Sequence, residues 1–100
     1  MKILQMDFAY AGPWKAEMTR ALRGVADDIA ATPGLRWKLW TENEETREAG
    51  GVYLFDDEAS ARAYATMHTE RLAGFGIGPV RTRLFDVNGD LSRVTKAPLA

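Results

Sequence analysis

The stretch LRWKLWTENEETREAGGVYLF, residues 35–55, decides the fold that the sequence predicts. Its two halves, residues 35–42 and 47–55, have the composition of β-strands, and the polar link 43–46 has the length of a hairpin connection. Gly50 and Gly51 interrupt the second strand. They indicate either a β-bulge, which we favour, or a place where another group comes close to the backbone.

Outside this hairpin, the pattern upstream predicts one strand and one helix. Apolar and polar residues alternate over residues 2–10, which is typical of a strand. A helix follows, because apolar residues recur at spacings of three and four. We expect it to begin at Gly12-Pro13, with proline in the first helical position, and to end at Thr32-Pro33-Gly34.

Downstream of the hairpin, the pattern predicts a second helix and a fourth strand. Asp56-Asp57-Glu58 suits a helix N-terminus, and the glycine-rich segment 74–79 ends that helix. Residues 80–87 form the strand, Asn88-Gly89-Asp90 forms a turn, and the last ten residues have no assignment. The order β-α-β-β-α-β predicts an α+β, ferredoxin-like fold with an antiparallel sheet.

The composition excludes several classes of protein. At 100 residues the chain is expected to form one domain, residues 1–100. A net charge of −1 argues against a nucleic-acid partner, and zero cysteines with one histidine exclude disulfides, thiolate sites and His-rich metal centres. No apolar run reaches the ~20 residues of a membrane helix, and the N-terminus does not resemble a signal peptide. We therefore expect a cytoplasmic protein with no membrane partner.

Both faces of the predicted sheet carry large apolar side chains. Alternation places Trp37 with Leu35 and Leu39 on one face of its strand. The other face carries Trp40 together with charged residues, namely Arg36, Lys38 and Glu42. A ferredoxin-like sheet has helices on one face only, and aromatic residues on the open face would form an aggregation-prone patch. We therefore expect a homodimer, with Trp37 facing the helices and Trp40 facing a cavity or the partner.

The chain resembles the YdhR-like family of putative monooxygenases, within the dimeric α/β-barrel superfamily. The stretches that carry the resemblance are Phe8–Pro13, Trp37–Glu42, Glu48–Phe55, His68–Leu72 and Phe85–Asn88. The resemblance implies ferredoxin-like subunits that pair into a dimeric α/β barrel. It also implies a monooxygenase that uses molecular oxygen, and no cofactor or metal, to oxidise a small phenolic or quinol-like aromatic. Two alternatives stay open: a non-catalytic dimer that binds a small molecule, and haem binding or degradation with His68 as an axial ligand.

An oxygenase of this kind must exclude water, assist deprotonation of its substrate and stabilise the resulting enolate or phenolate. The candidate catalytic residues are Trp40 and Tyr53, as hydrogen-bond donors, and His68, the natural base by its ordinary pKa. The candidate substrate-binding residues are Trp37, Arg83 and Phe85. Each has a structural alternative: the aromatic residues can be packing residues, His68 a buried hydrogen-bonded histidine, and Arg83 a charge that protects a sheet edge.

Overall fold

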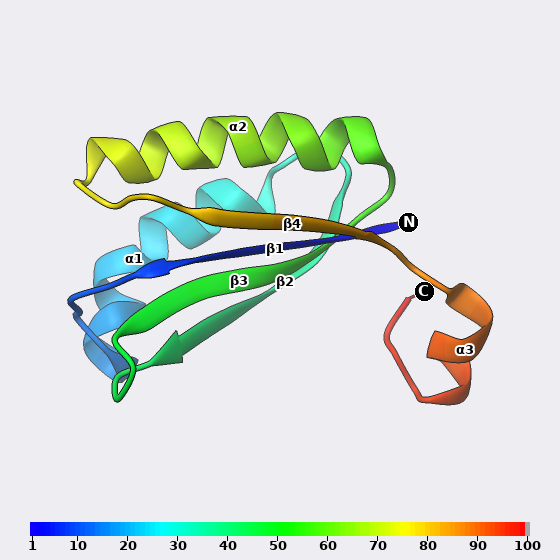
Figure 1. Ribbon diagram of the computed structural model, residues 1–100, viewed down its shortest axis with the longest axis horizontal. Helices are drawn as coiled ribbons and strands as arrows, with labels where there is room; N and C mark the ends of the chain where they lie inside the picture. The colour runs from blue at the N-terminus through cyan, green and yellow to red at the C-terminus, as the bar shows by residue number, and fades with distance from the viewer. Residues whose placement is uncertain (100) are drawn as a thin grey trace.

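A computed structural model describes residues 1–99 of the chain. Its elements, in chain order, are β1 (Lys2–Ala9), α1 (Lys15–Ala30), β2 (Leu35–Asn43), β3 (Glu48–Phe55), α2 (Glu58–Gly74), β4 (Arg81–Asp86) and α3 (Gly89–Val94). Figure 1 shows α1 and α2 along one side of the sheet, and α3 beyond its end, next to the C-terminus. Among the described residues, no helix has the length and apolar character needed to cross a membrane.

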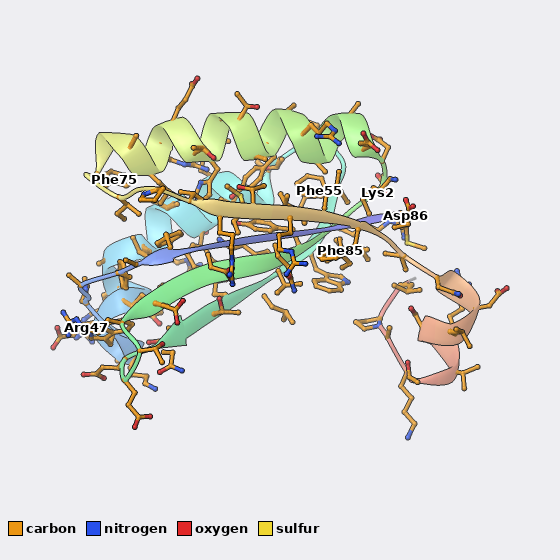
Figure 2. All side chains as sticks on the ribbon, in the orientation of Figure 1. Lys2, Arg47, Phe55, Phe75, Phe85 and Asp86 are labelled. Carbon is orange, nitrogen blue, oxygen red and sulfur yellow. The ribbon has the colours of Figure 1, made fainter. Side chains whose placement is uncertain are left out.

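The four strands form one sheet in the order β2-β3-β1-β4, and every neighbouring pair is antiparallel. The predicted ferredoxin-like fold is thus confirmed. Lys2 at the start of β1 forms ion pairs with Asp86 on β4 and with Glu58 on α2, at the end of the sheet where α2 begins (Figure 2). These pairs join three elements at one corner of the molecule.

The core lies between the sheet and its two long helices. Leu4 on β1 pairs with Tyr53 on β3 and with Leu84 on β4, so these side chains share the helix-facing side of the sheet. The buried cluster consists of Leu4, Met6, Ile29, Tyr53, Phe55, Ala61 and Tyr64. Alternate residues of β1 and β3 therefore form the floor of the core, as their sequence pattern predicts.

Two predicted boundaries are wrong. Helix α1 begins at Lys15, not at Pro13, because the chain stays extended through Trp14 and the backbone N–H of Lys15 donates to the Glu42 carboxylate at 2.9 Å. The segment predicted as a turn at residues 88–90 begins helix α3 instead. Asn88 caps this helix, since its side-chain oxygen accepts from the Leu91 backbone N–H at 3.1 Å.

The irregularity of the sheet falls in β2, not at the paired glycines. Leu35 pairs with Phe55 and Trp37 pairs with Leu54, which leaves Arg36 as an extra residue between them. This bulge puts Leu35 and Trp37 on opposite faces. The expectation that Trp37 faces the helices is therefore wrong: Trp37 lies on the open face, and Trp40, opposite Gly51, lies on the helix-facing side.

Gly50 and Gly51 lie in a regular part of β3, so the favoured bulge interpretation is wrong and the second interpretation is confirmed. A β-carbon on Gly50 would overlap the backbone carbonyl oxygen of Met6. A β-carbon on Gly51 would lie 2.6 Å from Cε of Lys38. The two glycines therefore allow a close approach of backbone on one side and of a lysine side chain on the other.

The face of the sheet turned away from α1 and α2 is only partly covered. Leu39 is 59% exposed and Phe85 is 41% exposed. At one end of this face the tail folds back: the Trp37 indole N–H donates to the Pro98 carbonyl at 2.8 Å, and Arg36 donates to the Leu99 carbonyl at 2.7 Å. The segment after α3, which the sequence left unassigned, thus covers part of the open face as far as Leu99.

Candidate functional site

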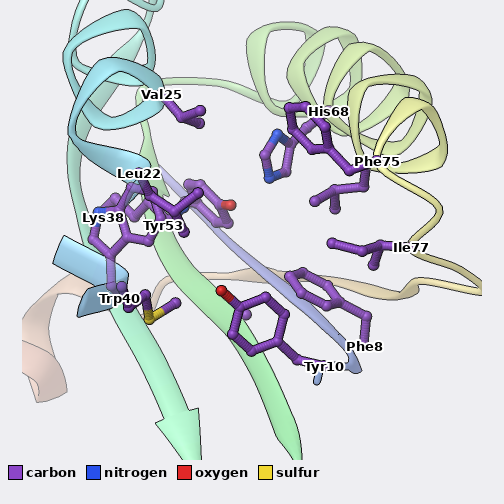
Figure 3. Close-up of a pocket in the computed structure, with 13 residues that line it drawn as sticks. Phe8, Tyr10, Leu22, Val25, Lys38, Trp40, Tyr53, His68, Phe75 and Ile77 are labelled. Atoms are coloured by element: carbon purple, nitrogen blue, oxygen red, sulfur yellow. The ribbon is translucent and has the colours of Figure 1, made fainter. Parts of the chain in front are cut away.

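A pocket with a cavity volume of about 50 Å³ opens between the helix-facing side of the sheet and the helices α1 and α2. Figure 3 shows the side chains that surround it. The apolar lining residues are Phe8, Met18, Leu22, Val25, Leu72, Phe75 and Ile77. The lining residues with a polar atom in the side chain are Tyr10, Lys38, Trp40, Tyr53 and His68. The pocket is therefore a mainly apolar space with a few polar groups around it.

The strand register explains why several of these polar groups converge. Lys38 and Trp40 are two residues apart on β2, so their side chains share a face. Tyr53 on β3 is the direct partner of Lys38. His68 comes from α2, where its ring stacks on Tyr64 with the ring centroids 5.1 Å apart. Two neighbouring strands and one helix thus supply four polar side chains to one space.

Hydrogen bonds hold two of these groups in place. The Tyr64 hydroxyl donates to the Tyr53 hydroxyl at 3.2 Å inside the core. Arg71 donates from Nε to Nδ1 of His68 at 3.2 Å, and its guanidinium also binds the Asp28 carboxylate on α1 at 2.5 Å. Because Nδ1 of His68 accepts a hydrogen bond, the neutral ring carries its proton on Nε2.

Burial shifts the pKa values of three side chains in the pocket, those of His68, Tyr53 and Lys38. Burial, together with the positive charges of Lys38 and Arg71, lowers the pKa of His68 to about 4, so the imidazole is neutral near pH 7. Burial and the neighbouring Tyr64 raise the pKa of Tyr53, which keeps its hydroxyl protonated. Burial, with a contribution from Arg71, lowers the pKa of Lys38 to about 7.

The structure brings together one group of the predicted site residues and separates the other. Trp40, Tyr53 and His68, the candidate catalytic residues, all line the pocket. Trp37 and Phe85 lie on the opposite face of the sheet, as does Arg83, whose guanidinium lies 5.2 Å from the Phe85 ring centroid. The candidate substrate-binding residues are thus separated from the pocket by the sheet.

Lys38 lines the pocket but is not among the site residues predicted from the sequence. A lysine on a strand is usually solvated, and nothing in the local pattern of β2 distinguishes it from Arg36. The available signal was Gly51, which leaves room beside a neighbouring strand for a long side chain. Within residues 1–99, no three side chains of the kinds that bind metals lie close enough together to hold an ion.

Comparisons with known proteins give one family and one fold. The sequence model of the family described as "putative mono-oxygenase ydhR" matches residues 3–98. Among solved structures, the chain is similar to a crystal structure described as a putative antibiotic biosynthesis monooxygenase from Deinococcus radiodurans, with a TM-score of 0.61. The two chains are 13% identical, over 88% of this chain and 93% of the other, which shows a shared fold alone. No curated protein matches the sequence.

Proposed function

The chain belongs to the family of the putative mono-oxygenase ydhR, and from this premise we propose that it oxidises a small phenolic or quinol-like aromatic without a bound cofactor. In this reaction one atom of O₂ becomes bonded to a ring carbon of the substrate, and the other atom leaves in water. The substrate itself supplies all the electrons that reduce O₂. A naphthol, for example, gives a naphthoquinone and water.

The observation that carries this proposal is the meeting of Trp40, Tyr53 and His68 in one apolar pocket. An electron-rich ring needs such surroundings, because water would solvate the developing charge and weaken fixed hydrogen bonds. The Trp40 indole N–H and the Tyr53 hydroxyl are donors for a substrate oxygen. We assign His68 the role of a third donor, not of the base expected from its ordinary pKa, because its pKa is about 4 and Arg71 occupies Nδ1.

The proposal includes a homodimer in which the open faces of two sheets pack together. Leu39 and Phe85, both well exposed in a single chain, support this arrangement because sheets packed face to face bury such residues. Trp37, Arg83 and Phe85 then lie at the interface between subunits. In such a dimer, these three side chains contact either the partner subunit or a substrate bound between the two sheets.

Oxygen consumption tests the proposed function. Purified protein, with a metal chelator present, is supplied with a panel of anthrones, hydroquinones and naphthols. We expect uptake of O₂ in equal amount to the quinone formed. Trp40→Phe is expected to lower the rate about tenfold or more, because the variant loses a donor to the developing charge.

Trp37→Phe is the matched variant on the other face of the same strand. A loss of rate in Trp40→Phe alone would support a substrate in the pocket, and a loss in Trp37→Phe alone would support a substrate between the sheets. Product formation that needs added metal or flavin would contradict the cofactor-free reaction. Ligand binding without O₂ uptake, across the whole panel, would favour a non-catalytic binding protein.

A further inference from the structure

Lys38 carries a half-buried amine that the proposed function does not use. Its Nζ lies 3.4 Å from the centroid of the Trp40 ring and 4.8 Å from that of Tyr53. The residues that line the pocket, all within 1–99, include neither aspartate nor glutamate. Among the ion pairs of the described residues, none involves Lys38. A positive charge here has aromatic ring faces around it but no anion.

The other ionisable groups around Lys38 do not supply that anion. On β3, Tyr53 stays protonated, and on α2, His68 is neutral near pH 7. Arg71 on α2 is a second cation, and its charge is shared with Asp28 of α1. Tyr10, which follows β1, also lines the pocket, and burial raises the pKa of its hydroxyl, as does the negative charge of Glu42 on β2. The Glu42 carboxylate accepts a hydrogen bond from the Lys15 backbone N–H and does not line this pocket. The residues that line the pocket therefore supply no negative charge to Lys38.

We propose that the pocket takes its aromatic substrate as an anion, and that Lys38 is the base that removes the proton from the substrate hydroxyl. The inference rests on the proposed function and names the ionised form of its substrate, a phenolate or, for an anthrone-like ketone, the enolate formed from its enol tautomer. The substrate O–H bond breaks, the proton bonds to the lone pair of Nζ, and the electron pair stays on oxygen. The products are an ammonium and an oxyanion that form an ion pair inside the pocket.

Lys38 is better placed for this step than the other candidates. With a pKa of about 7, a large share of the amine is unprotonated near neutral pH and can accept a proton. The pKa of His68 is too low for a base of similar strength, and its Nδ1 already accepts from Arg71. After the transfer, the ammonium stabilises the oxyanion strongly, because the apolar lining screens charges weakly. This electron-rich anion is the form of the substrate that donates electrons to O₂ most readily.

A phenol that changes colour on ionisation tests this inference without turnover. Para-nitrophenol is colourless when neutral and yellow as its anion. At about pH 6, where most free dye is neutral, we expect the wild-type protein to bind it as the yellow anion, with the dye pKa lowered by about one unit or more. Lys38→Met is expected to abolish this shift and to weaken binding of the anion about tenfold. Lys96→Met, a change at an exposed lysine in the tail, is the control and should leave the shift intact.

Lys38→Arg separates the two roles of Lys38. A guanidinium keeps the positive charge but does not give up its proton, so the variant should still bind the yellow anion. Its rate of oxidation should fall about tenfold or more with substrates that arrive neutral, and less with substrates already ionised in solution. An unchanged rate with neutral substrates would show that Lys38 holds the anion but is not the base, which would overturn that half of the inference.

The remaining outcomes separate the inference from the proposed function. Wild-type protein that binds the dye in its neutral form or does not bind it, or a Lys38→Met variant with an unchanged shift, would overturn the inference even if O₂ is consumed. A Lys38-dependent shift with no O₂ uptake on the whole panel would uphold the anion site and contradict the oxygenase.

Discussion

The two faces of β2 reverse the usual rule of apolar inside and polar outside. On the face that α1 and α2 cover, Lys38 lies between the rings of Trp40 and Tyr53. On the uncovered face, its neighbour Leu39 is 59% exposed. A half-buried amine without a counter-ion costs folding stability and an exposed leucine costs solubility, so neither is explained by the stability of a single chain. The contrast favours a ligand for the covered face and a protein partner for the open one.

The largest expected effect on stability comes from a substitution in β3, the strand that pairs with both β1 and β2. Gly50→Ala would place a β-carbon against the Met6 carbonyl oxygen, a backbone atom that cannot move without separating β1 from β3. We expect a loss of about 3 kcal/mol or more in the free energy of unfolding, measured by denaturant titration. Gly24→Ala is the matched control, because a β-carbon there would have no atom within 4 Å other than those of its chain neighbours and its own helix backbone. It should stabilise α1 by up to about 1 kcal/mol, and equal losses in the two variants would refute the close approach.

The open face can be tested by charging it. Leu39→Lys should weaken association of two chains by about 2 kcal/mol, or roughly 30-fold, because it buries a charge in a packed interface. The molecular mass in solution, measured by light scattering over a dilution series, reports this change. Val94→Lys, at an exposed position on α3, should leave the mass unaltered. A dimer that survives Leu39→Lys undiminished would place the interface elsewhere.

On the covered face, replacing Lys38 with an apolar residue should stabilise the protein. Lys38→Met should raise the free energy of unfolding by about 1.5 kcal/mol at about pH 6, since it removes a half-buried amine without a counter-ion. The gain should shrink at about pH 9. The folded protein releases the Lys38 proton near pH 7, whereas the unfolded chain holds it to about pH 10, so wild-type stability rises with pH across that window. A gain that is independent of pH would show that the fold leaves the pKa of Lys38 unchanged.

The smallest expected effect concerns the tail on the open face. Trp37→Phe removes the donor to the Pro98 carbonyl and should cost about 1 kcal/mol. Denaturant titration measures the loss, and faster digestion by carboxypeptidase would show that the tail is released. If digestion is as slow as in the wild type, the contacts of Arg36 and Leu99 are sufficient to hold the tail.

The order of the first six elements could be predicted from the sequence, because each has a strong period and a clear boundary signal. Other features depend on contacts that a local pattern does not contain. The start of α1 is decided by Glu42, which lies 27 residues from Lys15. The bulge at Arg36 is invisible to simple alternation, and this single extra residue moved Trp37 to the other face. Helix α3 is so short that its Asn88 cap looks like a turn.

The candidate site was predictable only where side-chain type and strand face were both known. Trp40 and Tyr53 were predicted as site residues because the indole N–H and the phenol hydroxyl are hydrogen-bond donors, and both side chains line the pocket. The role expected of His68 depended on its ordinary pKa, which burial changes. Lys38 was missed because only the covering helices shield this strand lysine from water. The residue types therefore predicted the hydrogen-bond donors of the pocket, but not the protonation states of His68 and Lys38.

The position of the Lys38 amine over Trp40 gives the protein an internal optical reporter. Indole emission responds to a charge placed 3.4 Å above the ring, so the fluorescence of Trp40 should change when Lys38 loses its proton or gains an anion beside it. The chain has three tryptophans, and the other two, Trp14 and Trp37, line neither this pocket nor the covered face of β2. With both replaced by phenylalanine, the remaining emission would follow occupancy and charge in the pocket in real time, with no label and before any product forms.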